Sequence, residues 1–157
     1  MSVWRRFPEH GFPSLVTTNV AGRQPIFREP GVAEQLLRVI AGVRSEEPLG
    51  LHGYVIMPDH VHLVLSVRAR TSLGRVMQLI KGRFAWRYNR SNDRSGKVWQ
   101  DRYHEKALRS ESALLRALQY VEDNPVTGGL ADRPESYPWS SARELVLGQA
   151  ESLTPVL

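Results

Sequence analysis

The feature that most limits the fold is a pair of strand patterns joined by a tight turn. Residues 49–57 read LGLHGYVIM and residues 58–65 read PDHVHLVL, and both are rich in the apolar and β-branched residues typical of strands. Pro58 and Asp59, where the patterns meet, are turn formers. We therefore expect an antiparallel pair of strands, and with it an antiparallel sheet.

The second of these strands begins with two histidines, His60 and His62. Successive side chains of a strand point to opposite faces, so both imidazoles are expected on one face while apolar residues fill the other. Two such rings could bind one metal ion, although an exposed polar pair is the more common fate of a His-x-His sequence. The pair alone is a weak indication, and a metal site would need a third ligand.

The remaining patterns predict a small α+β domain around these two strands. The expected elements, in chain order, are a strand over 14–20, a helix over 32–44, the strands over 49–57 and 58–65, a helix over 71–92, a strand over 98–108, and helices over 110–124 and 139–145. The order β-α-β-β-α-β followed by an additional helix is the ferredoxin-like pattern. We expect Pro125 to end the helix over 110–124, and 157 residues to form one domain over 1–157.

Composition narrows the functional classes. The chain has a net charge of +5 and a pI of about 10.0, which favours a polyanionic partner. It contains no cysteine, which excludes disulfides and cysteine-ligated zinc. Neither a signal peptide nor a run of about 18 apolar residues is present, so we expect a cytoplasmic protein without membrane contact.

The positive charge is concentrated in the middle of the chain, which favours nucleic acid as the partner. From the middle of the predicted helix over 71–92, arginines recur at spacings of four, three and four, at Arg83, Arg87, Arg90 and Arg94, and aromatic residues lie among them. Such rings could stack on unpaired bases; the alternative is a solvated arginine face, or one paired with acids, beside core aromatics. The candidate DNA-binding residues are Lys81, Arg83, Arg87, Arg90, Trp99, Arg102 and His104.

The helix over 110–124 adds two polar groups that suit a reactive site. Tyr120 and Asn124 are four residues apart, so they lie on one face of the helix. A tyrosine hydroxyl there could be a nucleophile, and an amide oxygen could bind a cation. Taken singly, each has an ordinary alternative: packing for the tyrosine, and capping of the helix before Pro125 for the asparagine.

Five segments together resemble one known family. They are GYVIMPDHVHLVL (53–65), LIKGRFAWRYNR (79–90), VWQDRYHEKAL (98–108), YVEDNPVTGGL (120–130) and YPWSS (137–141). In this order they are similar to the REP-associated tyrosine transposases, a branch of the single-tyrosine HUH transposases. The resemblance extends roughly from residue 16 to residue 141.

The resemblance implies an enzyme that cuts and rejoins single-stranded DNA, at hairpin or REP-like elements, through a covalent 5′-phosphotyrosine. It makes Tyr120 the nucleophile and His60, His62 and Asn124 the metal ligands. Asn124 stands where insertion-sequence relatives carry glutamine. A tyrosine pKa near ~10 makes the free hydroxyl a poor nucleophile, and a Mg²⁺ or Mn²⁺ ion would polarise the scissile phosphate.

Further expectations concern the setting of this reaction. No nucleotide-binding glycine-lysine loop is present, as suits a reaction that conserves phosphodiester bond energy. We expect a monomer rather than a homodimer, acting on single-stranded or hairpin DNA at the bacterial nucleoid. Two other functions fit part of the pattern: a catalytically silent binder of DNA hairpins, and a metal-dependent phosphodiesterase that uses water instead of Tyr120.

Overall fold

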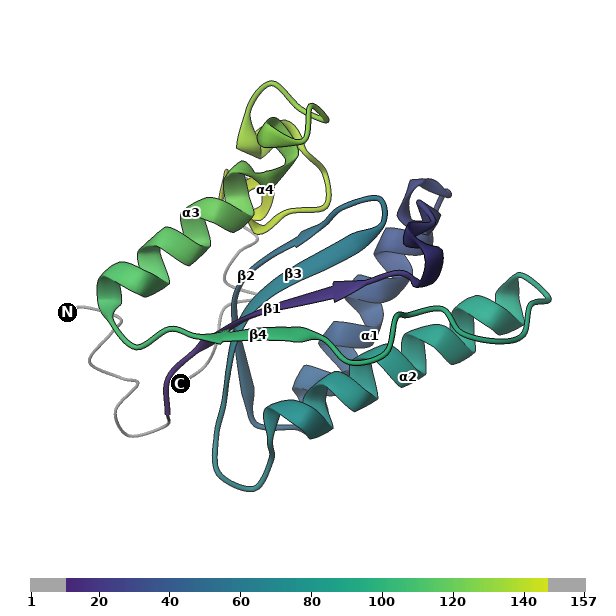
Figure 1. Cartoon of the computed structure of the whole chain (residues 1–157), viewed down its shortest axis with the longest axis horizontal. Helices are drawn as coiled ribbons and strands as arrows, with labels where there is room; N and C mark the ends of the chain where they lie inside the picture. Colours follow the sequence, from purple (N-terminus) through teal and green to yellow (C-terminus); the bar gives the residue numbers. More distant parts are fainter. Residues whose placement is uncertain (1–10, 147–157) are drawn as a thin grey trace.

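The computed structural model describes residues 11–146 and places a four-stranded antiparallel sheet at their centre (Figure 1). The strands are β1 (Ser14–Asn19), β2 (Leu49–Ile56), β3 (His60–Val67) and β4 (His104–Ala107), in the spatial order β2-β3-β1-β4. The helices are α1 (Val32–Glu46), α2 (Leu73–Ser91), α3 (Glu111–Thr127) and α4 (Ser141–Val146), with 3₁₀ turns η2 (Ala21–Arg23), η3 (Ile26–Arg28) and η4 (Pro134–Ser136). The predicted α+β fold with an antiparallel sheet is confirmed, and α3 is the additional helix that carries Tyr120.

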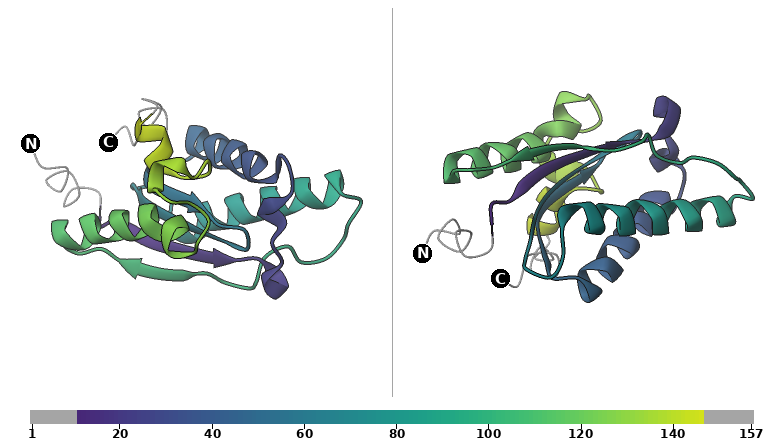
Figure 2. Two further views of the ribbon diagram at one scale, coloured as in Figure 1. Left: turned by 90° about the horizontal axis from the view of Figure 1, so that it is seen from above. Right: turned by 60° about the horizontal axis from the view of Figure 1, so that its bottom comes forward.

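Helices lie on both faces of the sheet (Figure 2). α1 and α2 pack on one face, where Val61, Leu63 and Leu65 of β3 join the larger apolar core. α3 packs on the other face, against Val55 and Val64. α3 therefore covers the face of β3 that carries the histidines, and Val64, on the same face, is buried beneath this helix.

Local sequence explains where α3 begins and how closely it packs. Ser110 caps the helix, since its Oγ accepts a hydrogen bond of 3.1 Å from the backbone N–H of Ala113. On the sheet, Gly53 leaves space for the helix: a Cβ at that position would lie 2.8 Å from Cδ2 of Leu118. The helix backbone thus passes close to β2.

The prediction that Pro125 ends α3 is wrong, because the helix continues to Thr127. A proline lacks the N–H that would bond to the carbonyl four residues earlier, and here the loss is confined to the last turn. The N–H of Gly128 closes that turn by donating to the carbonyl of Asn124 at 2.9 Å. Pro125 itself is buried.

The YPWSS segment covers the outer edge of β2. Tyr137 donates a hydrogen bond of 2.6 Å to the carbonyl of Ile56, and the N–H of Ile56 donates to the carbonyl of Trp139 at 2.8 Å. Ser141 Oγ accepts from the N–H of Tyr54 at 3.0 Å. Burial raises the pKa of Tyr137 to about 12. The segment thus shields a sheet edge that would otherwise present unpaired backbone groups.

Strand β4 is shorter than the predicted strand over 98–108. Val98 and Trp99 are separated from it, and Trp99 forms an isolated bridge to Val20. Arg102, between the two parts, has a left-handed backbone with φ of +65°, which interrupts the extended conformation. No helix among residues 11–146 is long and apolar enough to cross a membrane.

Candidate active site

The register of the sheet collects polar side chains in one row on the α3 face. His62 of β3 lies opposite Thr17 of β1, and Thr17 in turn lies opposite His104 of β4. Directly paired residues of neighbouring strands share a face, so these three side chains form a line across the sheet. One step along, His60 lies opposite Asn19.

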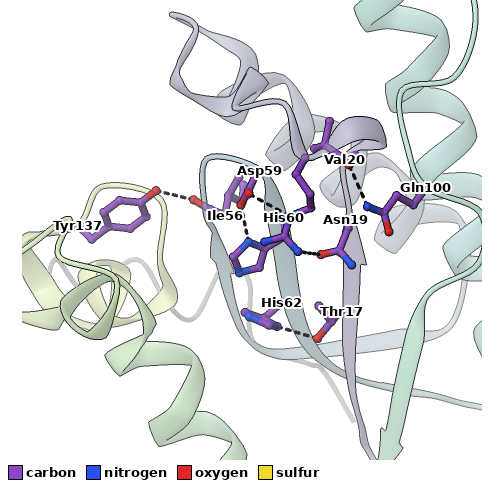
Figure 3. A network of polar contacts seen from close by, with 10 residues as sticks. Thr17, Asn19, Val20, Ile56, Asp59, His60, His62, Gln100 and Tyr137 are labelled. Atoms are coloured by element: carbon purple, nitrogen blue, oxygen red, sulfur yellow. Dashed lines mark hydrogen bonds and ion pairs between the residues drawn. The ribbon is translucent and has the colours of Figure 1, made fainter.

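His62 is buried, with 4% of its surface exposed. Its Nδ1 lies 2.8 Å from the hydroxyl of Thr17 (Figure 3). Burial, and then the positive charges of His60 and Arg23, lower the pKa of His62 to about 4. The ring is consequently neutral near pH 7, the form in which imidazole binds a metal ion.

His60 is held from the other direction by a chain of charged groups. Its Nδ1 lies 2.7 Å from Oδ1 of Asp59, and Oδ2 of Asp59 accepts from Nε of Arg23 at 3.0 Å. The same arginine donates to Oδ1 of Asn19 at 3.2 Å (Figure 3). Burial would raise the pKa of Asp59, but hydrogen bonds from His60 and Arg23 outweigh it and lower that pKa. An ionised carboxylate therefore orients the His60 ring.

These contacts fit a pair of metal-binding imidazoles. The two rings lie 4.8 Å apart between centroids, and in each the hydrogen bond occupies Nδ1, which leaves Nε2 as the donor for an ion. Metal-binding histidines commonly have the second nitrogen fixed in this manner. Within residues 11–146, no group of three or more His, Cys, Asp or Glu side chains could hold an ion, so the predicted set relies on an amide oxygen as its third donor.

Tyr120 reaches this pair from α3. Its ring centroid lies 5.4 Å from that of His62, with the planes at 70°, and 52% of the residue is exposed. Asn124 is one helical turn further on and half-buried. The structure thus brings His60, His62 and Tyr120 together, and Asn124 follows Tyr120 by one turn on the same helix.

A groove runs from this cluster between the sheet and α3. Its volume is about 430 Å³, and it is lined by Leu15, Thr17, Lys106, Leu108, Ala113, Arg116, Ala117 and Tyr120. Two cations of this groove, Lys106 and Arg116, were not among the predicted site residues. Arg116 had a detectable signal, because it lies four residues before Tyr120 and thus on the same helix face. The contacts that Thr17, Asp59 and Arg23 make with the histidines left no such signal in the sequence, since they depend on strand register and loop geometry.

The predicted DNA-binding residues of α2 lie on the opposite side of the sheet from Tyr120 (Figure 2). Arg83 is paired with Glu46 at 2.6 Å, and Arg90 lies over the Trp86 ring, 5.1 Å from its centroid. Arg87 is exposed. The arginines of α2 therefore do not border His60, His62 and Tyr120, because α2 packs on the other face of the sheet.

Trp99, another predicted DNA-binding residue, belongs to the apolar core. Trp99 is 6% exposed, packs near Phe27 and Phe84, and donates to the carbonyl of Lys81 at 3.1 Å. The prediction that Trp99 stacks on bases is wrong, since its faces lie within the apolar core.

Lys81 is engaged in a structural role. Its ammonium donates to the backbone carbonyls of Gln100 and Arg102, at 3.1 and 2.6 Å. Arg102 is exposed in the loop before β4. His104, by contrast, is exposed on the same sheet face as His62, so of the seven candidates it is the one placed in the row that contains a predicted metal ligand.

Comparisons with known proteins show the family to which the chain belongs. The family model described as "Transposase IS200 like" matches residues 15–124, more than half of the chain. The REP-associated tyrosine transposase of Escherichia coli (strain K12) is 24% identical over 143 residues, which cover 90% of this chain and 82% of that protein. A solved structure of a REP-associated tyrosine transposase bound to a REP hairpin has a TM-score of 0.75 at 23% identity and covers 99% of this chain and 89% of that chain. The chain belongs to the IS200-like transposase family, and the predicted resemblance to its REP-associated tyrosine transposases is confirmed.

Proposed function

We propose that this transposase cleaves and rejoins single-stranded DNA through a covalent bond between Tyr120 and a 5′-phosphate. The observation that carries the proposal is the contact of an exposed tyrosine with a buried, neutral histidine, at 5.4 Å between ring centroids. A tyrosine that merely packs has no need of two oriented imidazoles beside it.

In the proposed reaction, the Tyr120 oxygen attacks the phosphorus of one phosphodiester. A new oxygen–phosphorus bond forms, the bond from phosphorus to the 3′-oxygen breaks, the phenolic proton passes to water, and the departing 3′-oxygen takes up a proton. Because one phosphate ester replaces another, a 3′-hydroxyl can later attack the tyrosine ester and restore a phosphodiester. No nucleotide cofactor is consumed.

His60, His62 and Asn124 would hold the divalent ion, Mg²⁺ or Mn²⁺. When bound, the ion polarises the scissile phosphate and stabilises the charge that develops on its oxygens. The role of this chain is to orient both imidazoles, His62 through Thr17 and His60 through Asp59 and Arg23, and to keep His62 neutral by burial. Imidazole and amide ligands suit such ions better than a closed zinc site does.

Single-stranded or hairpin DNA of the REP type is the proposed substrate. The relative of known structure is bound to a REP hairpin, and the chain has a net charge of +5. We further propose a single domain that acts as a monomer in the bacterial cytoplasm, at the nucleoid. A monomer is supported because α3 packs on the sheet of its own chain and brings Tyr120 to the histidines of that chain.

The test is an adduct assay with a labelled single-stranded hairpin and Mn²⁺. Wild-type protein should yield a protein–DNA species that survives denaturation, and the Tyr120→Phe variant should yield none while still binding the hairpin. DNA cleaved without an adduct would indicate hydrolysis by water. Intact DNA with retained binding would indicate a silent hairpin binder. Either of these results would contradict the proposal.

A further inference from the structure

We infer that the groove between β4 and α3 binds the backbone of the single strand beside the scissile phosphate, with Lys106 and Arg116 as its phosphate-binding residues. The inference rests on the proposed function, because it takes Tyr120 as the point of attack. It places the DNA on the α3 face of the sheet, and not along the arginines of α2.

Both cations point into the same space as Tyr120. Arg116 lies one helical turn before Tyr120, and Lys106 comes from β4, opposite Leu15 of β1. These residues all line one groove, which is formed in part by Leu15, Lys106, Arg116 and Tyr120. Its volume is about 430 Å³, within the ~300–1,000 Å³ typical of ligand sites. The two positive side chains thus enter from opposite walls, one from the helix and one from the strand.

The charge of these two residues is available to a ligand. Among residues 11–146, no ion pair is formed by Lys106 or Arg116. The nearest acid in sequence to Lys106 is Glu105, but its side chain accepts a hydrogen bond of 3.0 Å from Ser14 on the other face. Arg83 of α2, in contrast, is neutralised by Glu46 at 2.6 Å.

The groove also borders one predicted metal ligand. Thr17 and Tyr120 line it, and both contact His62, so the proposed point of attack lies at this part of the groove. The floor is formed by apolar side chains, Leu15, Leu108, Ala113 and Ala117, which suit the sugar carbons of a nucleotide. Because β4 is an edge strand, a DNA strand can enter from the side without crossing the sheet.

The experiment compares two double variants that remove the same charge. Lys106→Gln with Arg116→Gln empties the groove of cations, and Arg87→Gln with Arg90→Gln removes two exposed arginines from α2. Affinity for a labelled single-stranded oligonucleotide is measured against salt, in buffer with a chelator. Each phosphate contact contributes about −0.7 to the slope of log affinity against log salt, so the groove variant should flatten it by about 1.4 and the α2 variant should leave it unchanged.

The result of this binding assay does not depend on cleavage, so it tests the inference separately from the proposed function. Three outcomes are informative. A wild-type slope in the groove variant would overturn the inference, and a flattened slope in the α2 variant alone would move the DNA to the other face. Lys106 could instead serve only to prevent the exposed edge strand β4 from pairing with another molecule. In that case its loss should cause self-association without a change in slope, and this result would also overturn the inference. The pair Lys106→Arg and Arg116→Lys keeps both charges and should retain the wild-type slope.

Discussion

The rings of Tyr120 and His62 meet at an angle of 70° with centroids 5.4 Å apart, although the two residues are 58 positions apart in the chain. The histidine is buried and the tyrosine is half exposed. The exposed tyrosine that we propose as the nucleophile therefore lies beside a buried imidazole that we propose as a metal ligand.

The hydroxyl of Thr17 should matter for metal binding rather than for folding. Thr17→Val removes the partner of His62 Nδ1 and keeps the shape of the side chain, so we expect Mn²⁺ affinity to fall by about 10- to 100-fold. Calorimetric titration with Mn²⁺ measures this directly. Thr18→Val is the matched control, since Thr18 Oγ1 is buried and has no hydrogen-bond partner within the described part of the chain; it should not weaken Mn²⁺ binding.

Equal Mn²⁺ affinity in the Thr17→Val and Thr18→Val variants would show that the Thr17 contact does not orient a ligand. Thermal unfolding of both variants provides the check on structure. The Thr18→Val protein should be at least as stable as wild type, because it loses a buried polar atom that lacks a partner.

The carboxylate of Asp59 should orient His60. Asp59→Ala deletes the 2.7 Å contact to Nδ1 of His60 and the contact to Arg23, so we again expect a loss of roughly 10- to 100-fold in Mn²⁺ affinity. Arg23→Gln should have a smaller effect, because it leaves the carboxylate in place. Asp101→Ala, which removes an exposed acid paired with Lys97, is the control; if it weakened Mn²⁺ binding as much as Asp59→Ala, the effect would be one of overall charge.

The free energy of unfolding should fall in mild acid because of two histidines, the partly buried His52 and the buried His62. Burial, and then the charge of Arg44, lower the pKa of His52 to about 4 from an ordinary 6.5. Below pH 6.5 the unfolded chain takes up a proton that the folded protein does not, so the free energy of unfolding decreases from about pH 6.5 down to about pH 4 and then levels off. For His52 alone the decrease is at most about 3 kcal/mol.

The measurement is chemical denaturation of the metal-free protein across this pH window. His62 has a similarly lowered pKa, so wild type should show the contributions of both residues. His52→Gln keeps a side chain able to bond to Ser66, which now lies 2.9 Å from His52 Nε2, and should show a clearly shallower pH dependence. An unchanged dependence in His52→Gln would mean that His52 titrates normally in the folded protein.

Local patterns were sufficient to predict the elements that form the site. The turn at Pro58 and Asp59 fixed the pairing of β2 with β3, and period-two alternation placed His60 and His62 on one face. Helical spacing joined Tyr120 to Asn124. These features depend on neighbours in the sequence, which is why a single sequence reveals them.

The features that sequence analysis missed depend on which faces meet in the folded chain. Arg83 pairs with Glu46 of α1, and Trp99 is buried because Phe27 and Phe84 enclose it. Neither contact leaves a periodic signal, so an arginine stripe and an interleaved tryptophan resembled a DNA surface. Strand β4 was predicted too long for a similar reason, since Trp99 bridges to Val20 outside the main ladder.

The most direct test of the central claim is to locate the covalent bond. The protein is incubated with a hairpin oligonucleotide and Mn²⁺, the adduct is digested with nuclease and protease, and the peptide that carries the nucleotide is sequenced by mass spectrometry. We predict a nucleotide joined through its 5′-phosphate to Tyr120. A nucleotide on any other residue, or cleaved DNA without a modified peptide, would contradict the account.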